Sequence, residues 1–258
     1  DFTYNGLVYD RFAVNANGWI SLGVSTLTPS VNINTTSAYT PLSSTVTTVT
    51  NELVARIAGY ARDLNAQTGA ELRFETIGSA PNRKLVVQWS NYRNYNATGN
   101  NLNFQIVLNE TTNSVDVIYG TMTVATSTTT MVGLRAEPNN NATNFNSRTS
   151  TTSWSSSSAS TNAGNTMTIS ATIFPASGLQ YSWSPPSCPA PTNVVVSNIT
   201  TNSADFSWTA GGSEFDWEYL ILPAGSPAPT GSGNDIDTDS FTEPGLNSGT
   251  AYAFWIRA

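Results

Sequence analysis

Histidine is absent from this 258-residue sequence, and cysteine occurs only once, as Cys188. Without a histidine, neither a Ser-His-Asp triad nor a Cys-His pair can be built, and a zinc site of His and Cys ligands is excluded as well. The kinds of site that remain open are a carboxylate pair, a Ser-Lys pair and a cation site made of oxygen ligands.

Charged residues are also scarce. They make up 10% of the chain, whereas an average globular protein has about 25%. With 17 acidic and 10 basic residues the net charge is -7, so the chain offers no basic surface for nucleic acid or for an anionic membrane. No apolar run approaches the roughly 18 residues of a membrane span. We therefore expect no nucleic-acid partner and no membrane insertion.

The clearest pattern in the chain is a series of three strands between Asn82 and Gly120. Apolar and polar residues alternate over 84–90 and again over 104–109, and β-branched and aromatic residues fill 115–119. A period of two is typical of half-buried strands, and the Asn- and Gly-rich segments between them are typical of turns. The sequence predicts an antiparallel meander here.

The rest of the first 184 residues also reads mainly as strands. Turn signals at Asn5-Gly6 and Asn17-Gly18 predict hairpins within residues 1–23. We expect a surface loop over 24–51, one helical turn near Asn51 followed by a strand, and a strand over 70–77 paired with the strand after Asn82. After the meander we expect a strand over 132–136, an exposed loop over 138–165, and strands over 167–174 and 181–183.

After the proline-rich residues 185–189, short strands separated by turn signals follow at 193–197, 203–209, 215–222, 240–242 and 250–257. This spacing is typical of an immunoglobulin-like sandwich. The sequence therefore predicts an all-β protein of two consecutive β-sandwich domains, residues 1–184 and 190–258, joined by a linker at 185–189.

The second domain resembles a fibronectin type III module. Ser207-Trp208-Thr209 is similar to the early core tryptophan of that family, and Leu246-Asn-Ser-Gly-Thr250-Ala-Tyr252 is similar to its Leu-x-Pro-Gly-Thr-x-Tyr corner, with Ser248 in place of proline. The resemblance implies that the last strand of the module lies beyond Ala258, so that the domain is truncated before it.

The first domain resembles an extracellular β-sandwich that is repeated in large secreted proteins of Bacteroidetes-type bacteria, and part of it resembles the nidogen-type extracellular domain. The matching phrases are Phe2-Thr-Tyr-Asn-Gly6, residues 12–23, Pro81-Asn-Arg83, Val87-Gln-Trp89 and residues 103–108. Where the relatives have Trp-Asp-Asp-Leu, this chain has Ala61-Arg62-Asp63-Leu64. The resemblance implies secretion, often by the type IX pathway, and a place on the cell surface, but no activity.

Cys188 stands alone just before the second domain. A single cysteine in a secreted chain is either a free thiol or one half of a disulfide. Related bacterial modules open with Cys-x-x-Pro and carry a second cysteine shortly after the strand that ends in Arg-Ala, here Arg257-Ala258. This resemblance implies a disulfide from Cys188 to a residue beyond the chain end; the alternative is a buried, inert thiol.

Two groups of residues are candidate binding sites. Trp89, Tyr92 and Tyr95 could form an aromatic platform for sugar rings, although the alternation of Trp89 with Val87 and Leu85 favours a core position for it. Asp235, Asp237 and Asp239 alternate oxygen ligands in the way that suits Ca²⁺, although a solvated turn explains them too. We expect no other cofactor.

The carboxylates Glu71 and Glu75 share a face of one predicted strand. Residues four apart in a strand lie about 13 Å apart, which is too far for the paired acids of a glycosidase. We therefore predict that the chain is not an enzyme. The preferred hypothesis is an extracellular surface module for adhesion, or a stalk or filament subunit, that binds cell-surface or matrix glycans or proteins, or copies of itself. The alternative is an accessory carbohydrate-binding region of a larger secreted hydrolase.

Overall fold

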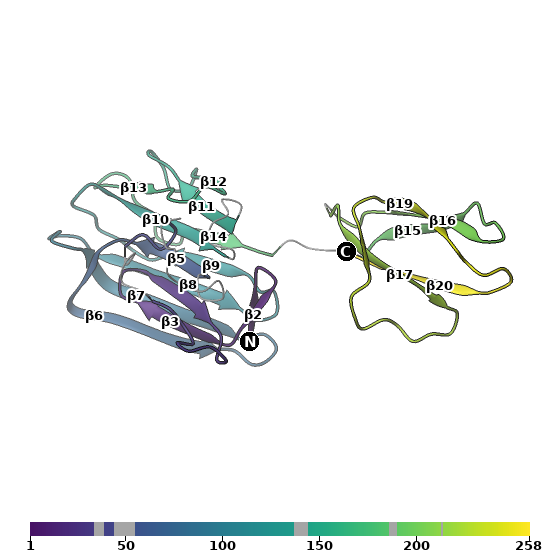
Figure 1. Cartoon of the computed structure of the whole chain (residues 1–258). Helices are drawn as coiled ribbons and strands as arrows, with labels where there is room; N and C mark the ends of the chain where they lie inside the picture. The colour runs from purple at the N-terminus through teal and green to yellow at the C-terminus, as the bar shows by residue number, and fades with distance from the viewer. Residues whose placement is uncertain (34–38, 44–54, 137–143, 186–189, 213) are drawn as a thin grey trace. The chain divides into compact units, whose positions relative to one another are not determined.

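The computed structural model describes residues 1–33, 39–43, 55–136, 144–185, 190–212 and 214–258. The chain divides into two compact units, Asp1–Pro185 (unit 1) and Pro186–Ala258 (unit 2). Every regular element in the described ranges is a β-strand (Figure 1). The all-β prediction is confirmed, while the helical turn expected near Asn51 falls outside the described residues. Within those residues, no helix has the length and apolar content to cross a membrane.

Unit 1 contains two large sheets and a small hairpin. The hairpin joins β1 (Phe2–Tyr4) to β2 (Leu7–Tyr9) through Asn5 and Gly6, both with positive φ, as the Asn-Gly signal predicted. The seven-stranded sheet has the order β12-β11-β10-β5-β4-β3, and β13 also pairs with β10. Its strands are β3 (Arg11–Asn15), β4 (Trp19–Gly23), β5 (Arg56–Ala61), β10 (Thr128–Arg135), β11 (Phe145–Thr149), β12 (Ser158–Ser160) and β13 (Met167–Ile169).

The second sheet of unit 1 contains the predicted meander. Its order is β14-β9-β8-β7-β6, with β6 (Leu64–Ile77), β7 (Lys84–Asn94), β8 (Leu102–Asn109), β9 (Val115–Tyr119) and β14 (Gln180–Trp183). The pairing of β6 with β7 is confirmed, but β6 begins at Leu64 rather than at Ala70. A β-bulge between Ala66 and Glu71 interrupts the regular pairing there, and it hides the first half of the strand from a period-two pattern.

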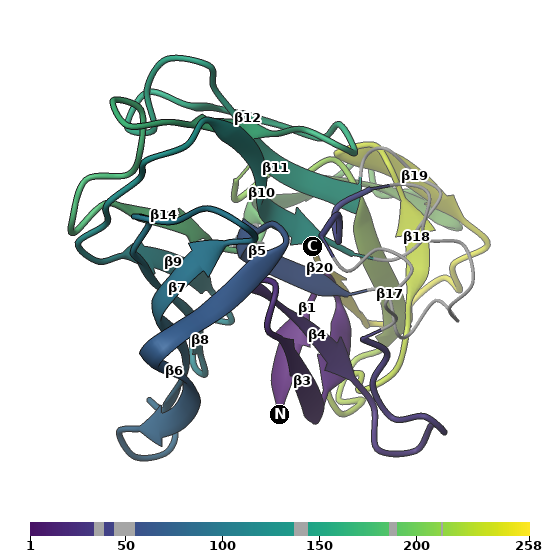
Figure 2. The same cartoon turned by 90° about the vertical axis from the view of Figure 1, so that its left-hand side faces the viewer.

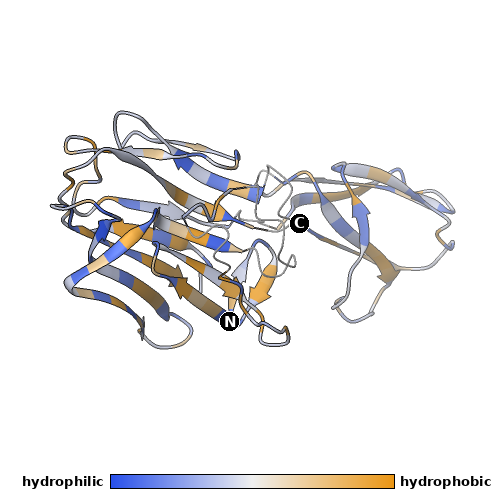
Figure 3. Cartoon of the chain, turned by 60° about the vertical axis from the view of Figure 1, so that its left-hand side comes forward, coloured by the Kyte–Doolittle hydropathy of each residue, from blue (hydrophilic) through white to orange (hydrophobic). Residues whose placement is uncertain are grey.

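The core of unit 1 lies between the two sheets. Hydrophobic and hydrophilic residues alternate along the strands (Figure 3), and the apolar members of the alternation face the other sheet. The sheets come close together at Gly59 of β5, where a Cβ atom would lie 3.0 Å from the Phe104 ring and 3.1 Å from Ile106 of β8. The Tyr119 hydroxyl donates a hydrogen bond to the Gly59 carbonyl at 2.7 Å. A side chain at residue 59 would force Phe104 and Ile106 to shift by a few tenths of an ångström.

A smaller cluster covers the other face of the seven-stranded sheet, and it includes two buried arginines. Arg56 lies over the Trp19 ring at 4.7 Å, and its burial lowers its pKa to about 10. Arg135, its neighbour across the β5–β10 pair, lies over Phe145 and donates to the Pro41 carbonyl at 3.1 Å. Residues 41–43 of the predicted 24–51 loop therefore pack on this face, where Leu42 joins the cluster and the Pro41 and Ser43 carbonyls accept from Arg135.

The stretch from 138 to 165 corrects the sequence-based expectation of an exposed loop. The structure places β11 and β12 there and buries Trp154. Small polar side chains take the place of apolar ones: the buried Ser147 hydroxyl donates to the Asn162 carbonyl at 2.9 Å and accepts from the Asn165 amide at 3.0 Å. Because these polar groups satisfy one another, strands form without apolar alternation.

Unit 2 is a sandwich of two three-stranded sheets, β15-β16-β19 and β18-β17-β20. The strands are β15 (Thr192–Ser197), β16 (Ser203–Thr209), β17 (Trp217–Pro223), β18 (Asn234–Ile236), β19 (Ser240–Pro244) and β20 (Tyr252–Arg257). Trp208 is buried edge-on against Trp217, with ring centroids 5.6 Å apart. The Tyr252 hydroxyl accepts a hydrogen bond from the backbone N–H of Asn247 at 3.0 Å. Both contacts are those that the fibronectin type III resemblance implies.

Candidate functional site

The predicted aromatic platform is not formed. Trp89 is fully buried, its indole N–H donates to the Ala16 carbonyl at 3.2 Å, and its ring stacks on Phe104 with centroids 4.9 Å apart. Tyr92 is buried as well, whereas Tyr95 is 55% exposed. The alternation along β7 turns Trp89 toward the core, so these three side chains do not share a surface for a sugar.

The three aspartates proposed for Ca²⁺ are not brought together. Asp235 lies in β18 opposite Glu218, while Asp237 and Asp239 follow the end of that strand at Ile236. Among the residues that the structure describes, no group of three His, Cys, Asp or Glu side chains could hold a metal ion. The sequence alternation that suggested a cation site arises here from a short strand and the turn after it.

The predicted disulfide and the carboxylates of β6 remain to be placed. Cys188 falls outside the described residues, so its disulfide stays a prediction. Glu71 and Glu75 lie on the exposed part of β6, and Glu71 is 3.4 Å from the Arg73 guanidinium. They form part of a charged strand face.

Charge is distributed unequally between the units. Unit 1 contains nine acidic and nine basic residues, so it is formally neutral. Unit 2 contains eight acidic residues and one basic residue, Arg257, and therefore carries the whole net charge of -7. Arg257 is itself paired with Glu218. Unit 2 will repel anionic partners at low salt.

Five charged residues of unit 1 line one groove of about 270 Å³, which we call the charged groove. Its lining comes from the β1–β2 hairpin, β3, and the neighbouring ends of β6, β7 and β8, and includes Asp1, Asp10, Arg11, Arg83 and Glu110. The floor between these polar groups is apolar, with Phe12, Leu22, Leu85 and Leu108.

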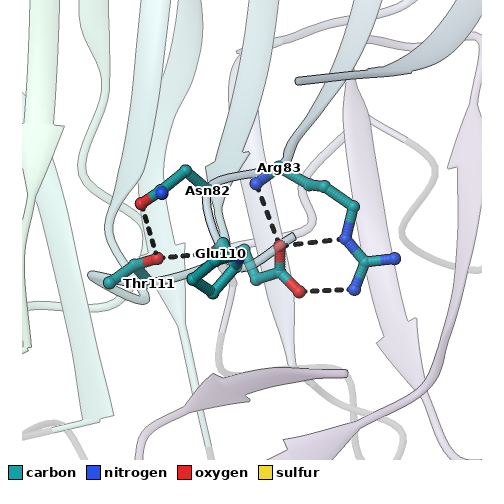
Figure 4. A network of polar contacts seen from close by, with 5 residues as sticks. Asn82, Arg83, Glu110 and Thr111 are labelled. Atoms are coloured by element: carbon teal, nitrogen blue, oxygen red, sulfur yellow. Dashed lines mark hydrogen bonds and ion pairs between the residues drawn. The ribbon is translucent and has the colours of Figure 1, made fainter. Parts of the chain in front are cut away.

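Several hydrogen bonds join Arg83 and Glu110 at the charged groove (Figure 4). The Glu110 carboxylate accepts from the Arg83 backbone N–H and from its Nε, each at 2.9 Å, and from Nη2. Thr111 donates to the Asn82 side chain at 3.0 Å beside it. This network fastens the β6–β7 turn to the β8–β9 turn.

The carboxylates of the charged groove are held in the ionised form. Hydrogen bonds from Arg83 lower the pKa of Glu110 to about 2, and hydrogen bonds from Ser25 lower the pKa of Asp10. Elsewhere, Thr242 lowers the pKa of Asp205 in the same way, and Arg257 that of Glu218. A general acid needs a pKa raised toward neutrality, so these groups are suited to binding and structure rather than to proton transfer.

A second hollow, of about 230 Å³, lies on the outer face of the five-stranded sheet, and we call it the amide hollow. Gln88 and Gln105 face each other across β7 and β8, and the Gln105 amide donates to the Gln88 carbonyl oxygen at 2.8 Å. Asn103 accepts from the Asn91 backbone at 2.9 Å and thereby holds a bulge in β7. Gly120 lies close against Asn103, where a Cβ atom at residue 120 would come within 3.1 Å of the Asn103 Cβ.

Sequence reasoning missed the amide hollow, although its signal was present. Uncharged polar residues gather in the middle of β7 and in β8, where amides occur at Gln88, Asn103 and Gln105. Uncharged amides on an exposed sheet face can both donate and accept hydrogen bonds. Only the cross-strand register, which the sequence does not give, shows that these side chains are neighbours.

Comparisons with known proteins agree on the two parts of the chain. The family model described as NIDO related matches residues 1–185, and that of the fibronectin type III domain matches residues 189–258. No curated protein matches the chain. Among solved structures, domains A168–A170 from titin are 12% identical and align over 76% of this chain and 92% of theirs, with a TM-score of 0.25.

The pair of Arg83 and Glu110 predicts a defined pH dependence. Because folding lowers the pKa of Glu110 from 4.5 to about 2, the pair stabilises the folded chain above pH 4.5 and this stabilisation disappears as the pH falls to about 2. Glu110→Gln should therefore be less stable than the wild type at pH 7 and should lose less stability between these pH values, measured by urea unfolding.

The matched control is Glu75→Gln, which removes an exposed carboxylate from β6. It should keep the acid dependence of the wild type. Equal pH dependence of Glu110→Gln and the wild type would show that the pair does not stabilise the fold.

Proposed function

The chain belongs to the NIDO-related family through residues 1–185 and continues into a fibronectin type III domain at residues 189–258, and from this premise we propose that it is a non-enzymatic surface module that acts in adhesion or as a stalk or filament subunit. Both domains are of the extracellular type. The observation that carries the proposal is the succession of two β-sandwich units of this type in one chain.

The cellular setting is part of the proposal. The phrases that resemble repeated domains of Bacteroidetes-type secreted proteins support export, by the type IX pathway, to the cell surface. A surface covered by uncharged polar residues, with 10% charged residues overall, suits contacts with cell-surface or matrix glycans or proteins and with other copies of the chain.

The electrostatics support a role without catalysis or a cofactor. The sequence has no histidine, and the carboxyl groups with displaced pKa values, Asp10, Glu110, Asp205 and Glu218, are all displaced downward. Each of them is ionised at neutral pH and is occupied by hydrogen-bond donors of the protein itself. Such groups stabilise local structure and do not exchange protons with a substrate.

One observation favours the second candidate, a carbohydrate-binding region of a larger secreted hydrolase. The amide hollow offers preoriented, uncharged hydrogen-bonding groups on an exposed sheet face. Neutral sugars present hydroxyl groups that both donate and accept, which is the complement of a Gln amide pair. This site replaces the aromatic platform, whose Trp89 is buried.

Surface display is tested on intact cells of the source organism with an antibody raised against the purified chain. We expect the antibody to label unbroken cells and protease treatment of those cells to remove the label. Beads coated with the purified chain should also bind cells or matrix saturably. Antigen that becomes accessible only after lysis would contradict the proposal.

The carbohydrate candidate is tested by binding of neutral polysaccharides to the chain and to Gln88→Ala and Gln105→Ala. Each substitution removes one amide from the hollow and should raise the Kd about tenfold, the effect of losing one or two hydrogen bonds. Gln180→Ala, on the edge strand β14 of the same sheet, is the control and should bind normally. Equal affinity of all four proteins would exclude the hollow as the sugar site.

A further inference from the structure

The strand β6 is an open edge of unit 1. It is the terminal strand of the five-stranded sheet, paired with β7 on one side only. In two views it lies at the rim of its sheet (Figures 1 and 2). All seven residues from Glu71 to Ile77 are exposed. Exposed strand edges present unpaired N–H and C=O groups that can pair with another strand.

We call residues 71–77 the edge segment. It is bounded by the β6 bulge, which ends at Glu71, and by Gly78, whose φ is +82°. Within it the pairing with β7 is regular, from Glu71 opposite Ser90 to Ile77 opposite Lys84. The edge segment is therefore a regularly paired stretch of seven residues whose central residue is Phe74.

The two faces of the edge segment have different chemistry. Leu72 and Phe74 lie opposite the core residues Trp89 and Val87, yet they are 37% and 62% exposed, and Phe74 meets only the rim of the other sheet, edge-on against Phe12 of β3 at 5.2 Å between ring centroids. The opposite face carries Glu71, Arg73 and Glu75 in alternate positions. An apolar row and a charged row thus lie on opposite faces of one free strand edge.

The order of charges decides which partner strand fits. If two copies pair antiparallel about a two-fold axis at Phe74, Arg73 of each copy lies opposite Glu75 of the other, and Phe74 lies opposite Phe74. If the axis passes through Arg73 instead, Arg73 opposes Arg73 and Glu71 opposes Glu75. Like charges directly opposite each other destabilise a strand pair, and opposite charges and aromatic pairs stabilise it.

A two-fold axis at Leu72 also pairs Arg73 with a glutamate, Glu71, but it pairs only part of the edge segment with itself. It places Phe74 opposite Ala70 and Glu75 opposite Gly69, whose φ is +77° in the bulged part of β6. The axis at Phe74 alone pairs the whole edge segment with itself.

We propose that the edge segment of β6 is a self-recognition site, at which two copies of this chain join their five-stranded sheets antiparallel about Phe74 into one continuous sheet. The charged residues select the register, because like charges destabilise the pairing about Arg73 and opposite charges stabilise the pairing about Phe74. The inference rests on the proposed function only in that surface display brings many copies together. It names the partner that the stalk or filament role requires, a second copy.

The association is weak in dilute solution. Seven residues per copy bury less area than a standard protein interface, and such small interfaces are transient. Display of many copies on one surface raises their effective concentration, so that weak contacts join neighbouring molecules. The test therefore uses high concentrations of the purified chain.

The first experiment is sedimentation equilibrium at up to about 1 mM, the range in which weak interfaces associate. The wild type should dimerise. Arg73→Glu places glutamate opposite Glu75, and Glu75→Arg places arginine opposite Arg73, so each variant alone should remain monomeric. An equimolar mixture of the two should dimerise, because residue 73 of each variant then lies opposite a residue 75 of opposite charge in the other. The double variant R73E/E75R should also dimerise.

The matched control is Lys84→Glu, which makes the same charge change as Arg73→Glu on the neighbouring strand β7. It leaves the edge segment intact and should dimerise like the wild type. An effect of overall charge would instead weaken both variants equally. Circular dichroism of each variant reports whether it is folded.

The second experiment fixes the register by oxidative crosslinking in a Cys188→Ser background. Phe74→Cys should crosslink to itself, since directly opposed residues have the Cα spacing that a disulfide requires. Ile77→Cys should not, because the two thiols lie about 20 Å apart in the proposed register.

The outcomes separate this inference from the proposed function. A wild type that is monomeric at every concentration, or a mixture of Arg73→Glu and Glu75→Arg that fails to associate, overturns self-recognition. Either result leaves cell-surface labelling unaffected. Crosslinking of Ile77→Cys in preference to Phe74→Cys, or capture of a strand from a different protein at β6 without self-association, likewise overturns it.

Discussion

The close approach of the two sheets at Gly59 is the constraint on which the rest of unit 1 depends. Gly59 allows the ring of Phe104 and the side chain of Ile106 to lie where a Cβ atom would otherwise be. The Tyr119 hydroxyl then reaches across to the Gly59 carbonyl. Burial raises the pKa of Tyr119 well above its ordinary value, so the hydroxyl keeps its proton and remains a donor. One hydrogen bond thus ties the interior of β5 to the last residue of β9.

The aromatic packing beside this contact closes the sandwich. Trp154 stacks between Tyr60 and Tyr181, with ring centroids 6.4 and 6.5 Å away, and meets Tyr119 edge-on. The aromatic side chains of unit 1 are therefore largely used inside, which explains why Trp89 offers no surface for a ligand. The charged groove, the amide hollow and the free edge of β6 remain accessible on the described surface of unit 1.

The sequence alone predicts those parts of the fold that depend on local patterns. Alternation locates β7, β8 and β9, and Asn5-Gly6 locates a hairpin, because each depends on neighbouring residues only. The bulged half of β6 and the serine-rich β11 cannot be predicted in this way, since a bulge breaks the period of two and Ser147 is satisfied by distant partners. The candidate sites depend on long-range structure as well: only the cross-strand register shows that Gln88 and Gln105 are neighbours, and only the structure shows that the three aspartates form no ligand group.

The contact of Tyr119 with Gly59 is tested most directly by the unfolding free energy of Tyr119→Phe in the whole chain. The variant keeps the ring packing and leaves the buried carbonyl without this donor, so unit 1 should lose about 1–3 kcal/mol of stability. Tyr95→Phe, at a position that is 55% exposed, is the control and should change stability little. If Tyr119→Phe unfolds at the same denaturant concentration as the control, the contact at Gly59 does not hold the two sheets together and the account is wrong.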